Sequence, residues 1–163
     1  MELSDEINLL NVAQMQVVST EEGMPVLFKY GNAFKVDIRI LFTFNPFGFL
    51  RMTKLRVEKG DKNTNIGVRM YASLNYSYIE DGKKILQTLE TYMVSLDKQH
   101  MNNTLFESEN VFHVNSMMLP SDQNIRETGN FELSLSWNLD EDEESRYQEI
   151  NIPLTIFEQF GLE

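Results

Sequence analysis

The sequence predicts an all-β fold, a single antiparallel β-sandwich of about eight strands. Over residues 131–139 apolar and polar side chains alternate without a break, which is the period of a strand with one buried face. The same alternation runs through 33–44 and 66–76, and residues with turn preferences separate the segments. Strands with one solvated face form antiparallel sheets. A chain of 163 residues, 42% of them hydrophobic, can bury one core, so we expect one domain over 1–163.

The pattern places strands at 7–18, 33–44, 49–58, 66–79, 84–96, 110–119, 130–139 and 147–156. The segment Asn45-Pro46-Phe47-Gly48 carries the residues that a type I turn favours, which predicts a hairpin between the second and third strands. Within the third strand the apolar phase slips by one residue between Met52 and Leu55, as it does at a β-bulge.

The pair Asp81-Gly82 predicts a tight hairpin that joins 66–79 to 84–96. In 84–96 the apolar residues also recur at helical spacing, so a short helix is the alternative there, and another is the apolar C-terminus. The β-branched and aromatic content favours a strand. Pro153 lies inside the last expected strand and cannot donate to a ladder, which predicts a sheet edge or a bulge at this position.

The expected architecture is similar in general style to immunoglobulin-like and C2-like domains. Trp137 lies in one of the strands, as a tryptophan does in antibody domains, but the chain has no cysteines to flank it. The resemblance is therefore one of architecture alone, and architecture does not determine function.

The absence of cysteine excludes disulfides, thiolate catalysis and cysteine-based zinc sites. Residues 1–6 are acidic and lack the basic and apolar regions of a secretory signal, and no apolar run is long enough to span a bilayer. We expect a cytoplasmic protein without membrane contact, an accessory protein of a bacterium or a phage. The sequence contains no Gly-x-Ser-x-Gly turn and no phosphate-binding glycine loop, so we expect no enzymatic activity.

The net charge of −11 is unevenly distributed along the chain. Residues 1–28 carry five acids and no base, whereas 29–69 carry nine bases and three acids. The local balances are −5, +6 and, for the remainder, −12, which together give −11. One block of the chain is basic and the rest is strongly acidic.

The acidic run at 140–144 contains three carboxylates that we consider as Ca²⁺ ligands, Asp140, Asp142 and Glu144. Neighbours in a hairpin loop splay apart, so a solvated loop is the favoured interpretation and we expect no cofactor.

The basic block contains four candidate partner-binding residues, Arg39, Arg51, Lys54 and Arg56. Their ribbon could contact phosphates, but the overall charge of −11 opposes nucleic acid. Cross-strand pairing with acids such as Asp37, Glu58 and Glu90 is the favoured interpretation. Phe47 is a further candidate, because the third position of a hairpin turn is normally exposed and exposed aromatics anchor interfaces. The favoured interpretation is that its ring folds back over the open end of the sandwich.

These observations favour a non-enzymatic protein-binding or assembly module that contacts a protein partner or a second copy of itself. A Ca²⁺-binding or carbohydrate-binding module in the style of C2-like or lectin-like sandwiches is the alternative. A third hypothesis is an acidic surface that mimics nucleic acid.

Overall fold

The fold is seen in a computed structural model, which describes residues 10–18, 26–45, 47–48, 50–51, 68–96, 105–139 and 147–159. Within these residues the chain forms nine strands in three sheets, with little helix. The predicted all-β, antiparallel fold is therefore confirmed. None of the helices in this part of the chain is long and apolar enough to cross a membrane.

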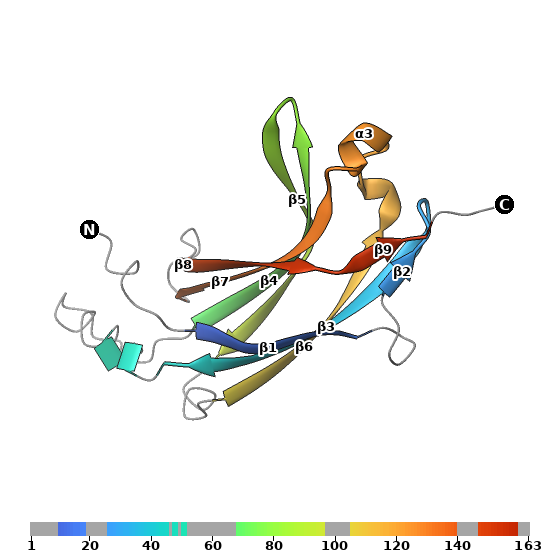
Figure 1. Ribbon diagram of the computed structural model, residues 1–163. Coiled ribbons are helices and arrows are strands. Elements are labelled where there is room, and N and C mark those ends of the chain that lie inside the picture. The colour runs from blue at the N-terminus through green and yellow to red at the C-terminus, as the bar shows by residue number, and fades with distance from the viewer. Residues whose placement is uncertain are drawn as a thin grey trace.

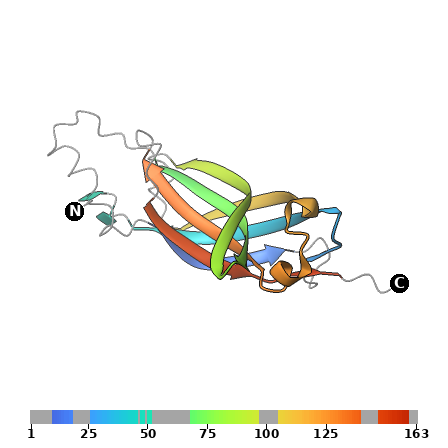
Figure 2. The same cartoon turned by 90° about the horizontal axis from the view of Figure 1, so that it is seen from above.

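Two antiparallel sheets face each other across the core (Figures 1 and 2). The first has the order β1 (Leu10–Val18), β3 (Ala33–Phe44), β6 (Leu105–Asn115). The second has the order β5 (Lys83–Leu96), β4 (Val68–Glu80), β7 (Asn130–Leu139), β8 (Tyr147–Leu154). A short parallel pair, β2 (Val26–Phe28) and β9 (Ile156–Glu158), lies at one end of the sandwich, near the C-terminus in Figure 1. The 3-10 turn η1 (Ser116–Met118) and the single helical turn α3 (Gln123–Arg126) lead from β6 to β7.

The core forms where the apolar faces of the two sheets meet. Along β3, Val36, Ile38 and Ile40 are fully buried, and Leu133 and Trp137 of β7 are at most 1% exposed. These residues share one phase of the alternation in each strand, since successive side chains of a strand point to opposite faces. The alternation that predicted the strands is thus the pattern that builds the core.

Side chains of β5 close one flank of the sandwich, where β5 and β6 are the edge strands of the two sheets. The hydroxyl of Tyr92 donates to the carbonyl of Val111 at 2.5 Å, and the carboxylate of Glu90 accepts from the N–H of His113 at 2.6 Å. The outer backbone groups of β6 are satisfied here without another strand. On the other flank, β1 and β8 are the edge strands.

Two predicted strands agree with the structure at both ends, 33–44 and 130–139. The segment 84–96 is a strand, β5, and the Asp81-Gly82 turn has positive φ angles of 52° and 74°, as a tight type I′ hairpin requires. The expected strand at 110–119 begins earlier, at Leu105, and gives way to η1 after Asn115. Pro153 lies in the edge strand β8, as predicted.

The predicted hairpin of 33–44 with 49–58 is wrong, because β3 pairs with β1 and β6. Residues 47–48 and 50–51 are helical, and the carboxamide oxygen of Asn45 accepts from the N–H groups of Phe47 and Gly48 at 3.1 and 3.3 Å. Asn45 thus caps a helical turn instead of opening a hairpin. The expected bulge at 52–55 lies outside the described residues. The alternative C-terminal helix is also wrong for 156–158, which form β9.

Candidate functional site

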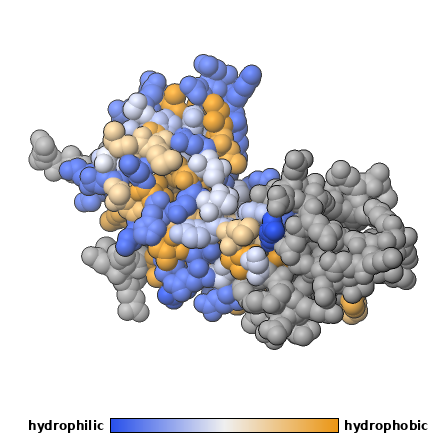
Figure 3. Space-filling model, turned by 180° about the vertical axis from the view of Figure 1, so that it is seen from behind, coloured by the Kyte–Doolittle hydropathy of each residue, from blue (hydrophilic) through white to orange (hydrophobic). Residues whose placement is uncertain are grey.

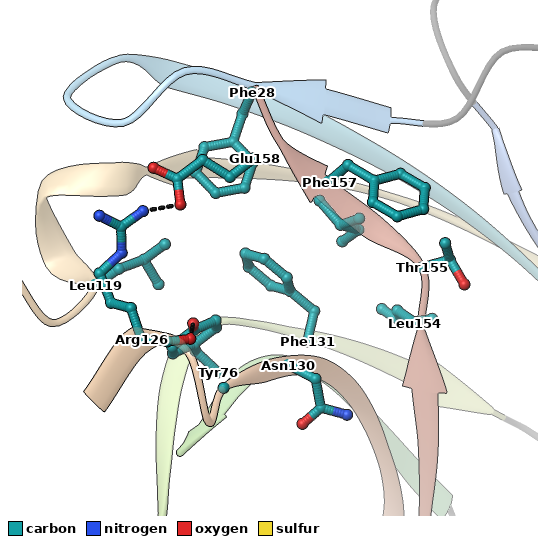
Figure 4. A pocket seen from close by; sticks show the side chains of 12 residues that line it. Phe28, Tyr76, Leu119, Arg126, Asn130, Phe131, Leu154, Thr155, Phe157 and Glu158 are labelled. Atoms are coloured by element: carbon teal, nitrogen blue, oxygen red, sulfur yellow. Dashed lines mark hydrogen bonds and ion pairs between the residues drawn. The ribbon is translucent and has the colours of Figure 1, made fainter. Parts of the chain in front are cut away.

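A pocket with both aromatic and polar lining residues lies at the end of the sandwich where β8 passes into β9, and its volume is about 320 Å³ (Figure 4). We call it the end pocket. It is lined by Phe28, Tyr76, Leu119, Arg126, Gly129, Asn130, Phe131, Leu154, Thr155, Ile156, Phe157 and Glu158. These residues come from β2, β4, β7, β8, β9 and the segment between β6 and β7, so the pocket exists only in the folded chain.

Aromatic rings form the floor of the end pocket. The Phe131 ring contacts those of Tyr76 and Phe28 edge to face, with centroids 5.0 and 5.8 Å apart. The Phe34 ring stacks on Phe28 at 4.4 Å and supports it from behind. Such pairs add stability beyond the area that they bury, so the contacts among these rings stabilise the floor.

Arg126 connects the elements at the rim of the end pocket. Its guanidinium forms an ion pair with the Glu158 carboxylate of β9, and it lies over the Tyr30 ring with its central carbon 4.1 Å from the centroid. Its backbone carbonyl accepts from the Tyr76 hydroxyl at 3.1 Å. The Arg126 and Glu158 side chains are only 15% and 19% exposed, so their charges neutralise each other in a partly desolvated place. Arg126 therefore holds β9 and α3 together and is not free to bind an anion.

Gly129 allows the close approach of the Tyr76 ring to the backbone. A Cβ atom at this position would lie 2.2 Å from the Tyr76 hydroxyl oxygen. Burial raises the pKa of the Tyr76 phenol above its ordinary value of 10.0, and the positive charge of Arg126 acts in the opposite direction. The phenol is therefore a neutral hydrogen-bond donor at physiological pH.

Two exposed hydrophobic side chains lie next to each other on the short parallel pair, Phe157 in the lining of the end pocket and Leu27 beside it. Leu27 and Phe157 are register partners across β2 and β9, and they are 46% and 50% exposed. Five further exposed hydrophobics lie on the β4–β5 hairpin and on η1: Ile79, Leu86, Met93, Met117 and Met118. Figure 3 shows hydrophobic side chains on the upper part of the molecule interspersed with hydrophilic ones, and scattered exposure of this kind is usual for protein surfaces. The adjacent pair at the end pocket is the more informative feature.

The predicted partner-binding residues lie apart from the end pocket. Phe47 is 79% exposed, so the interpretation that its ring folds back over the sandwich is wrong. Its helical turn (teal in Figures 1 and 2) lies at the opposite end of the molecule from β2 and β9. Arg51 is exposed on the same turn. Lys54, Arg56 and the Ca²⁺ candidates Asp140, Asp142 and Glu144 lie outside the described residues. Within the described ranges no three acidic or histidine side chains are grouped so that they could hold a metal ion.

Arg39 pairs with acids, as the favoured interpretation of the basic block predicted, although its cross-strand partner Glu109 was not among the acids named. Its guanidinium lies 3.6 Å from the Glu109 carboxylate, directly opposite on β6, and 4.0 Å from that of Asp37. Partial burial and the nearby Glu109 raise the pKa of Asp37, and Arg39 acts in the opposite direction. Glu90, named as another acid for this pairing, instead accepts from the backbone of His113.

The sequence interpretation missed Arg126 and the end pocket. One signal was available, because Arg126 is the only base between residues 99 and 145. An isolated arginine in an acidic segment is a candidate for a specific ion pair. The identity of its partner, 32 positions further along the chain, could not be read from spacing.

Comparisons with known proteins give distant structural likenesses only. No family model and no curated protein matches the chain. The sporulation control protein Spo0M of Bacillus subtilis is 7% identical with a TM-score of 0.44, and the match covers 94% of this chain and 51% of Spo0M. A β-glucosidase from Listeria innocua is 7% identical with a TM-score of 0.33, covering 91% of this chain and 16% of the enzyme. A β-glucosidase from intestinal bacteria involved in saponin metabolism is 11% identical with a TM-score of 0.34, covering 90% and 16%.

The chain thus spans about half the length of Spo0M and a small part of either glucosidase. With TM-scores below 0.5, these likenesses carry no argument about function. The class of the molecule is an all-β protein with two facing sheets, and its function has to be argued from its own residues.

Proposed function

We propose that this protein is a non-enzymatic binding module that receives a large apolar side chain of a partner protein in the end pocket. The observation that carries the proposal is the aromatic floor formed by Phe28, Tyr76 and Phe131, next to the exposed pair Leu27 and Phe157. Binding hot spots are apolar anchors seated in preformed pockets and surrounded by contacts that exclude water. The end pocket and the neighbouring pair match that arrangement.

The charges around the end pocket favour a partner segment with basic residues. In the described residues 119–139 and 147–159, the acids are Asp122, Glu127, Glu132, Glu149 and Glu158, and the one Lys or Arg is Arg126. Glu132 is paired with Lys84 of β5 at 3.3 Å, and Lys29 follows the pocket residue Phe28, so the unpaired acids within these described ranges are Asp122, Glu127 and Glu149. Arg126 is neutralised by Glu158. Complementary charge guides association and selects partners, so the expected ligand is a peptide with one aromatic or large aliphatic residue flanked by Lys or Arg.

Selection from a random peptide library displayed on phage, with the intact protein as target, tests the proposal. We expect enrichment of peptides with an apolar anchor and flanking basic residues. Their affinity should fall at least tenfold, equivalent to about 1.4 kcal/mol, in the variant Phe157→Ser. Met93→Ser is the matched control, because Met93 is 53% exposed on β5 and does not line the end pocket.

Two results would reject this function. One is a selection that yields no common pattern on the folded protein. The other is a peptide whose affinity is equally reduced by Phe157→Ser and Met93→Ser, because the contact would then not be located at the end pocket.

An aromatic-lined pocket also accommodates the ring of a small ligand, which is the feature that favours the carbohydrate-binding alternative. A ligand that binds only the folded state raises the melting temperature. A panel of sugars that shifts the melting temperature of the native chain, but not that of Tyr76→Leu, would favour this alternative over a peptide partner.

A further inference from the structure

Among the edge strands of the two main sheets, β1 is the one whose protection against pairing is a single irregularity, a bulge at Ala13 between Val12 and Gln14. Its sequence, Leu10–Val18, contains neither a charged residue nor a proline, and on one side it pairs with β3. Natural proteins protect edge strands with charges, prolines or covering groups, because the free N–H and C=O groups otherwise recruit another strand. Among the described residues, no strand pairs with the other side of β1.

The remaining edges are protected in each of these ways. The edge of β6 is covered by Tyr92 and Glu90. The edge strand β8 contains Pro153 and Glu149, and β5 begins with Lys83 and Lys84. The edge of β1 lacks the charges, the proline and the covering side chains found at the other edges, which indicates that this edge is used for contact.

A groove beside β1 provides space for the side chains of an added strand. It has a volume of about 310 Å³ and lies between β1 and the β8–β9 junction, which form the open flank of the sandwich. Its lining is mostly apolar: Met15, Val17, Val26, Pro153, Leu154 and Thr155. A strand added to β1 would direct every second side chain toward this groove and the intervening ones toward solvent. The required occupant alternates apolar and uncharged polar residues.

We propose that the occupant is β1 of a second copy of this chain, paired antiparallel across a two-fold axis perpendicular to the sheet. After the bulge at Ala13, residues 14–18 of β1 have the required pattern, because Met15 and Val17 are half-buried on the apolar face, whereas Gln14 and Gln16 are exposed. A two-fold axis of this kind keeps the apolar faces of both strands on the same side. The result is one continuous sheet of six strands, with the order β6-β3-β1-β1-β3-β6.

Charge supports a second copy at this edge. Two molecules with a net charge of −11 repel each other over most of their surfaces, but an uncharged strand adds no local repulsion at the contact. The amide groups of Gln14 and Gln16 donate and accept, so they are complementary to their own symmetry mates. Salt screens the overall repulsion and leaves the backbone ladder intact, so the dimer is strengthened by salt.

Light scattering behind size exclusion tests this inference on the intact protein, at about 0.01 M and about 0.15 M salt, where the screening length falls from about 30 to about 8 Å. We expect a mass that approaches twice 19.0 kDa as concentration rises, with more dimer at the higher salt. The double variant Gln14→Lys/Gln16→Lys should remain at 19.0 kDa under both conditions. The control Thr88→Lys/Ser95→Lys makes the same change of charge at exposed positions of β5 and should dimerise like the native chain.

Three outcomes would overturn the inference: a monomer at every concentration and salt, a dimer that persists in Gln14→Lys/Gln16→Lys, or a dimer that dissociates as salt rises. The last would mean that the basic and acidic parts of two copies pair instead.

The salt series uses the native chain, so a failure of the lysine variant to fold, seen by circular dichroism, does not remove the test. The inference does not depend on peptide binding at the end pocket, so either can fail without the other.

Discussion

Replacement of Gly129 by alanine should destabilise the protein by displacing the Tyr76 ring. The new Cβ atom would lie 2.2, 2.4 and 2.7 Å from Oη, Cζ and Cε1 of Tyr76, whereas unstrained carbon contacts begin at about 3.5 Å. The ring has little room to move, because Tyr76 is 6% exposed and packs against Phe131. The substitution therefore forces a shift of more than about 1 Å in a close-packed region.

Two costs contribute to the expected loss of stability. Overpacking of a core costs about 1–3 kcal/mol, and the lost hydrogen bond from the Tyr76 hydroxyl to the Arg126 carbonyl costs about 1 kcal/mol. The free energy of unfolding should fall by about 2–4 kcal/mol, measured by urea denaturation with an unchanged m value. For a chain of this size the melting temperature should fall by on the order of 10 °C.

A double-mutant cycle separates this mechanism from a general effect of alanine on the loop. Tyr76→Leu removes the ring atoms that the Cβ atom would meet, so in that background Gly129→Ala should cost less than about 0.5 kcal/mol. A coupling of about 2 kcal/mol or more is the expected result. If Gly129→Ala costs the same in both backgrounds, or leaves the native chain within about 0.5 kcal/mol of its original stability, the reasoning is refuted.

Three further predictions concern the rim of the end pocket, its phenol and the β4–β5 turn. Glu158→Gln should lower the free energy of unfolding by about 2 kcal/mol in urea denaturation, because it leaves the partly buried Arg126 charge without its partner; an unchanged midpoint would contradict the ion pair. Since burial raises the pKa of Tyr76, the protonated phenol is favoured in the folded state. Its contribution to stability is complete below pH 10.0 and is lost as the pH rises through the higher folded pKa, so urea midpoints should fall in alkaline solution less steeply in Tyr76→Phe than in the native chain. Gly82→Ala should cost about 1 kcal/mol in thermal denaturation, because Gly82 has a φ of +74° in the hairpin turn, and a gain in stability would contradict the positive φ.

The strands could be predicted because their alternation is a local consequence of having one buried face. Residues 33–44 and 130–139 show an unbroken alternation, and both were predicted with the correct ends. In β5 the register shifts opposite Leu74 and Asn75, where Glu90 and Thr88 are the partners and Leu89 is the extra residue. This irregularity spaces the inward residues Leu89 and Tyr92 three apart, which produced the helix-like periodicity of 84–96.

The sequence did not reveal two kinds of feature. One kind depends on side chains that suit two different local structures, and the other depends on contacts between residues far apart in the sequence. Asn45 accepts from the N–H groups two and three residues later both in a turn and at a helix start, so its sequence could not separate the two. The end pocket requires Phe28, Tyr76 and Phe131 to meet from three strands. The strands β2 and β9 have three residues each, which is too short for a period to be recognised.

Hydrogen exchange followed by mass spectrometry, at low and high protein concentration, tests most directly the claim that this is a contact module with one flank closed and the other open. We predict that residues 10–18 gain protection as concentration rises, because their free edge becomes paired in the dimer. Residues 105–115 should show constant protection, since Tyr92 and Glu90 already cover the β6 edge within one molecule. Protection that rises with concentration in 105–115 and stays constant in 10–18 would contradict the account.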